Sequence, residues 1–120
     1  MSKTDFTNLR LKHVVWRANL EGLFAGKKTM TEEQAINHKS CDVGKWLYAV
    51  GIKKYGDLPE IHELEKIHFK LHATVQKILL MKKSGDMYTE KEELGKLDKI
   101  LSKMMLLLVK IEEDLILDRR

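Results

Sequence analysis

Proline, glycine and cysteine are scarce in this sequence of 120 residues, which has one proline, seven glycines and one cysteine. So few turn-forming residues argue against a β-sandwich or a β-barrel, and the abundance of Leu, Lys, Glu and Met favours helix. A single cysteine excludes an internal disulfide framework, and a lone thiol is typical of proteins from a reducing compartment. We therefore expect an all-α protein of the cytoplasm.

Long apolar runs and an excess of one charge are also missing. The longest apolar run, MMLLLV at 104–109, is far too short to span a bilayer, and the polar start MSKTDFTNLRLKH has no signal-peptide pattern. The 22 basic and 18 acidic residues give a net charge of +4 and are spread along the chain. This pattern does not indicate nucleic-acid binding. The sequence predicts a single domain over residues 1–120, with no membrane insertion and no nucleic-acid partner.

Apolar residues recur at steps of three and four in three long segments, which is the pattern of amphipathic helices. These helices are expected over about 5–25, from Pro59 to the sequence SGD at 84–86, and over about 89–117. A shorter helix is expected between Ser40 as its N-cap and Gly51 as its C-terminal stop, and Thr31 with Gln34 predicts a capping box before it. Short connections favour an antiparallel four-helix bundle whose short helix carries the sequence C-x-x-G-x-W.

Two of the expected helices carry histidine in their buried stripes. His13 lies in the stripe of the first helix, and His68 lies in that of the third, with His72 one turn further on. If these helices run parallel, a rise of about 1.5 Å per residue places the three histidines at similar heights, about 12 to 20 Å from the helix starts. If the short helix runs antiparallel to these two, the same rise places Cys41, at its N-terminal end, about 15 Å from its C-terminal end, which is a similar height. The four side chains are therefore expected to meet at one level.

A buried cluster of three imidazoles and a thiol needs a binding partner, because burying these groups without one is costly. Thiolate and neutral imidazole are the preferred ligands of Zn²⁺, and histidines at i and i+4 project from one helix face. The residues thus predict a closed Zn²⁺ site made by His13, Cys41, His68 and His72. No enzyme activity is expected, because four protein ligands leave no open position and HFKLH lacks the glutamate of H-E-x-x-H.

Each of these residues also has a purely structural interpretation. A lone core histidine is usually only hydrogen-bonded, and a lone buried cysteine often packs as a small hydrophobe. His38 forms an H-x-x-C spacing with Cys41 and is the expected substitute if His13 is not a ligand, whereas His62 is expected to be solvated. Two alternatives stay open. One is a metal-free helical adaptor bundle, and the other is a haemerythrin-like di-iron oxygen-binding protein, although Lys66 stands where its H-x-x-x-E element would need a glutamate.

The string CDVGKWLY places Cys41, Gly44 and Trp46 in a C-x-x-G-x-W pattern, with a histidine about thirty residues before it and H-x-x-x-H about thirty residues after it. In this combination the chain resembles the chemoreceptor zinc-binding (CZB) family over nearly its whole length. The resemblance implies a cytoplasmic helical sensor module of bacterial chemotaxis receptors and diguanylate cyclases. It implies a homodimer with a signalling output domain or partner, and a response to zinc or to oxidants such as hypochlorous acid. The zinc ligands that it implies are His13, Cys41, His68 and His72.

Two further features have physical interpretations. Gly44 is expected to let a neighbouring helix or His13 approach closely, and Trp46 is expected to anchor the short helix to the bundle. The C-terminal sequence LLLVKIEEDLILDRR holds more leucine than one buried stripe needs. The excess predicts a dimer surface.

Overall fold

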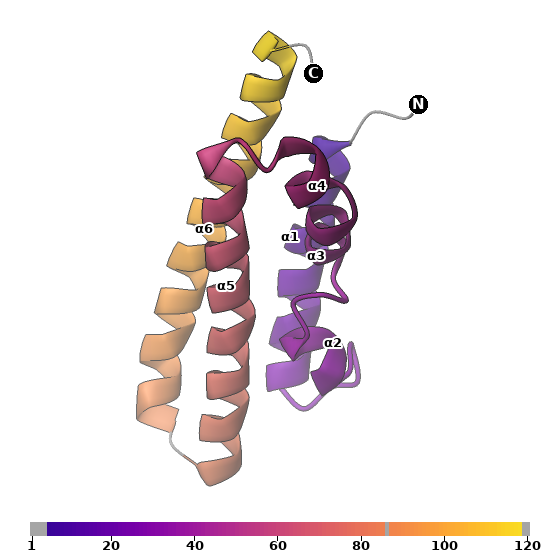
Figure 1. The fold of residues 1–120 in the computed structure, drawn as a ribbon. Coiled ribbons are helices and arrows are strands. Elements are labelled where there is room, and N and C mark those ends of the chain that lie inside the picture. Colours follow the sequence, from indigo (N-terminus) through magenta and orange to yellow (C-terminus); the bar gives the residue numbers. More distant parts are fainter. Residues whose placement is uncertain (1–4, 86, 119–120) are drawn as a thin grey trace.

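The computed structural model describes residues 5–85 and 87–118, apart from the side chains at 87–90 and 117–118. All regular structure in these residues is helical, as the sequence predicts. The elements are α1 (Phe6–Phe24), α2 (Glu32–Ile36), α3 (Asp42–Trp46), a π-helical turn η1 (Leu47–Gly51), α4 (Ile52–Tyr55), α5 (Pro59–Ser84) and α6 (Met87–Asp118). In Figure 1, α1 and α5 run in the same direction, α6 returns antiparallel to α5, and the α3 to α4 segment climbs back beside α1. The result is a four-helix bundle with one short member.

Local signals set the ends of the long helices. Asp5 is the N-cap of α1, and its side chain accepts a hydrogen bond of 2.9 Å from the backbone N–H of Asn8. Pro59 opens α5, where its missing N–H is harmless. Gly85 closes α5 in the left-handed conformation at φ 81°, which glycine adopts at little cost. The expected bounds of these helices are therefore confirmed to within about two residues.

The core is formed by the apolar stripes of α1, α5 and α6. In α5, six residues at alternating steps of three and four are all buried: Ile61, Leu64, His68, Leu71, Val75 and Ile78. In α1 the last buried side chain is Phe24, whereas Leu23 is only partly buried. In α6, Leu97 and Leu108 are fully buried, but Leu94 and Leu101 are only half-buried. The stripe periodicity is thus correct, and the exact edge of each stripe depends on the neighbouring helix.

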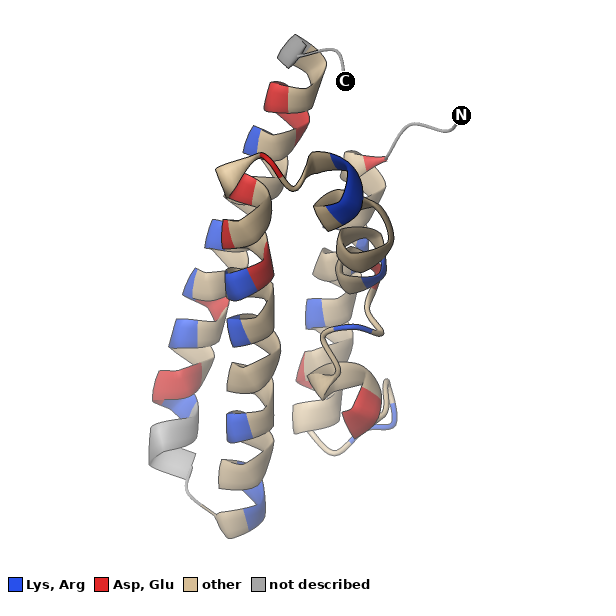
Figure 2. Ribbon diagram, in the orientation of Figure 1, with Lys and Arg blue, Asp and Glu red and all other residues tan. Residues whose placement is uncertain are grey.

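Ion pairs join α6 to α1. Arg10 and Arg17 of α1 contact Glu112 and Asp98 of α6 at 3.0 and 2.8 Å. Figure 2 shows basic and acidic residues interleaved along α5 and α6, as the mild net charge suggests. Partly solvated pairs of this kind contribute little to stability, about 0–1 kcal/mol each, so they orient the helices more than they stabilise the bundle.

The short helix begins one residue later than expected. Cys41 is the N-cap in place of Ser40, because its backbone is extended and its Sγ accepts a hydrogen bond of 3.4 Å from the N–H of Gly44. The Ser40 hydroxyl donates instead to the carbonyl of Asn37. The motif cysteine therefore stands where a helix N-terminus begins, and its sulfur is turned toward the first turn of α3.

The expected stop at Gly51 is wrong. Gly51 keeps a right-handed helical backbone inside the π-helical turn, and the helix continues through α4 to Tyr55. A Cβ at Gly51 would lie 2.9 Å from the ring of Trp46, so this glycine makes room for the indole rather than ending the helix. Trp46 packs edge-on against Phe6 with ring centroids 5.4 Å apart. This contact attaches the short helix to α1, as expected for Trp46.

The predicted capping box is confirmed. The Thr31 side chain accepts from the N–H of Gln34 at 3.1 Å, and the Gln34 side chain accepts from the N–H of Thr31 at 3.0 Å. The box starts α2, whose residue Ala35 is fully buried against the bundle. In this way a single short turn carries the carbonyl of Ala35 into the interior.

Candidate metal centre

The four predicted site residues come from three parts of the fold and meet in the interior. His13 lies on α1, Cys41 at the start of α3, and His68 and His72 on successive turns of α5. Each offers one ligand atom, and these four atoms all lie within 4.8 Å of one another. The imidazoles are at most 1% exposed, whereas Cys41 is partly exposed. The four side chains therefore come together at one level of the bundle, as expected.

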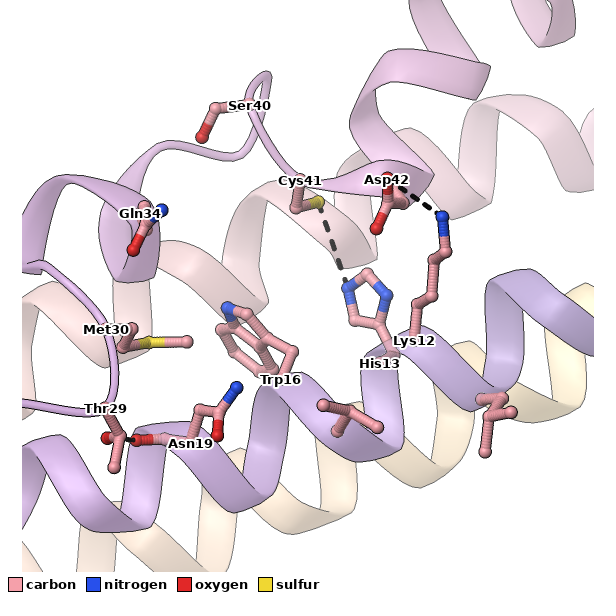
Figure 3. Close-up of a pocket in the computed structure, with 12 residues that line it drawn as sticks. Lys12, His13, Trp16, Asn19, Thr29, Met30, Gln34, Ser40, Cys41 and Asp42 are labelled. Carbon is pink, nitrogen blue, oxygen red and sulfur yellow. Dashed lines mark hydrogen bonds and ion pairs between the residues drawn. The ribbon is translucent and has the colours of Figure 1, made fainter.

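The sulfur of Cys41 is the centre of the cluster. Its Sγ lies 2.8 Å from Nε2 of His68 and 3.9 Å from Nε2 of His13, and the latter contact is drawn in Figure 3. A tetrahedral Zn²⁺ site with bonds of about 2.0–2.3 Å holds sulfur and nitrogen ligands about 3.6 Å apart. The two observed distances bracket that value. The side chains thus need only small adjustments to share one ion.

The backbone carbonyl of Ala35 orients the His72 ring toward the cluster. Its Nδ1 donates a hydrogen bond of 2.8 Å to the carbonyl of Ala35 on α2. Because the carbonyl only accepts, the proton must be on Nδ1, and the lone pair is therefore on Nε2. That Nε2 is buried and has no hydrogen-bond partner, a state that costs about 1–3 kcal/mol in a metal-free core. Orientation of a ligand imidazole by a carbonyl is typical of metal sites.

Burial keeps all three imidazoles neutral. Desolvation, with a smaller contribution from neighbouring histidines, lowers the pKa of His13 to about 4 and that of His68 to about 2. Desolvation also lowers the pKa of His72 to about 4, against the hydrogen bond to Ala35. Neutral imidazole is the form that binds metals. Burial raises the pKa of the Cys41 thiol to about 11, although backbone N–H groups of Gly44 and Val43 oppose the shift.

The donor set fits a soft or borderline metal ion. Three neutral imidazoles and one thiol carry no net charge, and the sulfur becomes a metal ligand when the thiol proton is lost. Imidazole nitrogen and thiolate sulfur are ligand types that Zn²⁺ prefers, and four such ligands match its tetrahedral coordination. No carboxylate belongs to this cluster among the residues that the structure describes. A haemerythrin-like di-iron site, which needs bridging carboxylates, therefore has no support from this geometry.

Gly44 is required by a close backbone approach. A Cβ at this position would collide with the carbonyl oxygen of His38, and it would lie 3.0 Å from the carbonyl carbon of His38 and 3.1 Å from Cα of Lys39. The crowding atoms belong to the loop just before Cys41, not to a neighbouring helix or to His13, so that part of the expectation is corrected. The glycine lets the loop fold against the first turn of α3 and so presents Cys41 to the interior.

The two remaining histidines lie outside the cluster. The ring of His38 packs against Phe69 at 5.0 Å and lies 6.2 Å from the ring of His68, next to the site but without a ligand atom in it. Since His13 does reach the cluster, the substitute role considered for His38 is not needed. His62 is exposed, and its Nε2 hydrogen-bonds the carbonyl of Gly56 at 2.6 Å.

Two groups that contribute to the site were not predicted from the sequence: the carbonyl of Ala35 and the ring of Trp16. The carbonyl of Ala35 has no sequence signal, because any residue supplies the same backbone group. The ring of Trp16 lies 5.5 Å from that of His13 and 5.0 Å from that of His72, so this tryptophan packs against two cluster residues. A tryptophan three residues after a candidate ligand lies on the same helix face and was the available signal.

One family model matches the chain. Its description is chemoreceptor zinc-binding domain (CZB), and it covers residues 13–79, which is more than half of the sequence. The matched segment starts at His13 and contains the other three cluster residues. Neither a curated protein sequence nor a solved structure matches the chain. Among the described residues, no helix has the length and apolar character needed to cross a membrane.

Proposed function

Because the chain belongs to the chemoreceptor zinc-binding domain family, we propose that it is a cytoplasmic sensory domain that binds Zn²⁺ through His13, Cys41, His68 and His72. The observation that carries the proposal is the convergence of four ligand atoms from α1, α3 and α5 within 4.8 Å. The unpartnered Nε2 of His72 supports it, because a metal-free adaptor bundle would leave this atom unsatisfied.

Different residues of the chain would bind the metal, orient a ligand and stabilise the thiolate. A bound Zn²⁺ supplies a positive charge that keeps Cys41 deprotonated and joins the three helical segments. Ala35 orients His72, while the N–H of Gly44 at 3.4 Å and the N-terminus of α3 stabilise negative charge on the Cys41 sulfur. The role is regulatory and not catalytic, since four protein ligands leave no position for a substrate.

Two signals are consistent with this arrangement. In the first, the occupancy of the site is the signal, because binding ties α1, α3 and α5 together and release frees them. In the second, an oxidant such as hypochlorous acid converts the Cys41 thiolate to a sulfenic acid and weakens its hold on the metal. Both act on the short helix from Cys41 to Tyr55, which carries one ligand only.

The proposal includes a homodimer and a signalling output domain or partner protein. Leu106 and Ile116 of α6 are 70% and 67% exposed, which supports an apolar contact surface on this helix. Leu117, part of the leucine excess noted in the sequence, has a side chain outside the described residues.

The test is the metal content of the purified, untagged protein by inductively coupled plasma mass spectrometry. We expect about one zinc per chain, and loss of the zinc in a Cys41→Ala, His72→Ala double variant. His38→Ala is the matched control, because this histidine lies beside the cluster without belonging to it, and it should retain zinc. Absence of zinc from the wild-type protein would refute the proposal, and iron with a visible absorption band would favour the di-iron alternative.

The oxidant signal has its own test. Zinc-loaded protein is treated with a slight excess of hypochlorous acid, and zinc release is followed together with the mass of the peptide that contains Cys41. Release of zinc in step with oxidation of Cys41 is expected. If zinc and thiol are both unchanged, the signal is occupancy alone.

A further inference from the structure

Asp42 places a carboxylate beside the candidate metal ligands. It follows Cys41 directly, as the first residue of α3, and both residues line a cleft of about 460 Å³ between α1 and the 29–42 segment (Figure 3). His13 also lines this cleft, whereas the two histidines of α5 do not. A cation that comes from the cleft therefore meets the residues of α1 and α3 before it meets those of α5.

The charge of Asp42 acts on two of the candidate ligands. Burial lowers the pKa of His13 and raises the pKa of the Cys41 thiol, and in both groups the negative charge of Asp42 favours the protonated form. In Figure 3 the carboxylate lies next to Cys41 and on the same side of His13 as the sulfur. A carboxylate in this position attracts a cation toward the cluster, and carboxylate oxygen is itself a ligand of Zn²⁺.

Lys12 of α1 opposes this attraction. Its Nζ lies 3.6 Å from Oδ1 of Asp42, and the two side chains are 48% and 46% exposed. An ion pair with this exposure contributes little to stability and opens readily, because water solvates both partners. When it opens, the carboxylate of Asp42 is free to bind a cation from solution, next to three imidazoles that are themselves at most 1% exposed.

We propose that Zn²⁺ enters its site through this cleft, with Asp42 as the first protein ligand and Lys12 as the competing cation that moves aside. The inference rests on the proposed function, since it names how the ion reaches that site. Asp42 replaces one water of the hydrated ion. Cys41 binds the ion next and releases its thiol proton to solvent, and His13 and the histidines of α5 then complete the ligand set.

The test compares the rates of zinc uptake by two variants that keep the side-chain shape and remove a charge. Metal-free Asp42→Asn and Lys12→Gln proteins are mixed with Zn²⁺ in a stopped-flow instrument, and a rapidly exchanging indicator follows the loss of free Zn²⁺. Uptake should be at least roughly fivefold slower than wild type in Asp42→Asn and measurably faster in Lys12→Gln. Both differences should shrink at high salt, which screens the charges.

Glu32 and Lys83 supply the matched control. Glu32 is also an acid in the first turn of a short helix, and it forms an ion pair of 3.0 Å with a lysine of a long helix, but neither residue lines the cleft. Glu32→Gln and Lys83→Gln change the net charge by the same amounts and should leave the uptake rate unchanged. Thermal unfolding of the metal-free proteins establishes that all four variants are folded.

The opposite effects of the two substitutions distinguish this role from simpler ones. If the ion pair only stabilises the fold, both variants lose it and their uptake rates shift in the same direction. If loss of the thiol proton alone sets the rate, Asp42→Asn takes up zinc faster, because it removes a charge that helps to raise the pKa of Cys41. Either result, or rates equal to those of the control variants, would overturn the entry route.

The amount of zinc bound at the end of the reaction tests the proposed function separately. We expect about one zinc per chain in the wild-type protein and in every variant, reached at different rates. One zinc per chain at equal rates would overturn the entry route and leave the proposed function standing. No uptake by the wild-type protein would refute both.

Discussion

Replacing Gly44 by alanine tests why the glycine follows the motif cysteine. Alanine is favoured over glycine in a helix by about 0.5–1 kcal/mol, so the backbone alone would gain stability. The added Cβ, however, would collide with the carbonyl oxygen of His38 and lie 3.1 Å from Cα of Lys39. These are backbone atoms that cannot rotate away. Overpacking of this kind costs about 1–3 kcal/mol, so we expect a net loss of about 1–2 kcal/mol.

Gly95→Ala is the control for this substitution. Gly95 lies within α6, and a Cβ there would have nothing within 4 Å, so only the helix propensity changes. It should stabilise the protein by about 0.5–1 kcal/mol. Thermal unfolding with chelator present measures both variants. At roughly 4 °C per kcal/mol for a domain of this size, Gly44→Ala should lower the midpoint by roughly 4–8 °C while Gly95→Ala raises it.

The same substitution should weaken the metal site. The loop that must move to admit the Cβ leads directly into Cys41, so the sulfur shifts relative to His13 and His68. Competition with a chromophoric chelator should show at least roughly tenfold weaker zinc binding for Gly44→Ala, about 1.4 kcal/mol, and no change for Gly95→Ala. The reasoning fails if Gly44→Ala matches or exceeds the wild-type stability.

Three further predictions concern the same fold. Zinc at about 100 times its dissociation constant should add about 2.7 kcal/mol of stability, seen as a chelator-sensitive melting midpoint, and Cys41→Ala should abolish that sensitivity. Thr31→Ala removes the capping box of α2 and should cost about 1 kcal/mol in urea unfolding; it should also weaken zinc binding, because α2 carries the carbonyl that orients His72. Leu97→Ala, in the fully buried stripe of α6, should cost about 2–5 kcal/mol, yet leave the zinc content of the folded protein unchanged, since α6 supplies no cluster residue.

Much of the fold was predictable because its signals are local. Stripe periodicity, Pro59 and Gly85 define α5, and a side chain cap defines the start of α1. The start of α3 was misplaced because serine is the commoner N-cap and Cys41 takes that position instead. The predicted stop at Gly51 was wrong because this glycine makes room for the indole of Trp46. That need arises from packing, which the sequence around Gly51 does not show.

The candidate site was predictable for a different reason. Four residues with metal-binding side chains stand at spacings that helical rise converts into one level of a bundle, so side-chain chemistry and periodicity suffice to name His13, Cys41, His68 and His72. The groups that orient these side chains and pack against them were not predictable. The carbonyl of Ala35 is a backbone atom, and the contact of Trp16 with two histidines depends on how α1 faces α5.

The sequence by itself determined the helical class, the long helices and the set of candidate ligands, because each follows from residue type and from spacing along one helix. Tertiary structure alone decided which histidine nitrogen faces the cluster, which backbone atoms crowd Gly44, and which side of the site meets solvent. These properties arise between segments distant in the chain, where α1, α5 and the 29–42 segment come together. The partial exposure of Cys41 beside three fully enclosed imidazoles is therefore a consequence of packing, and no residue pattern encodes it.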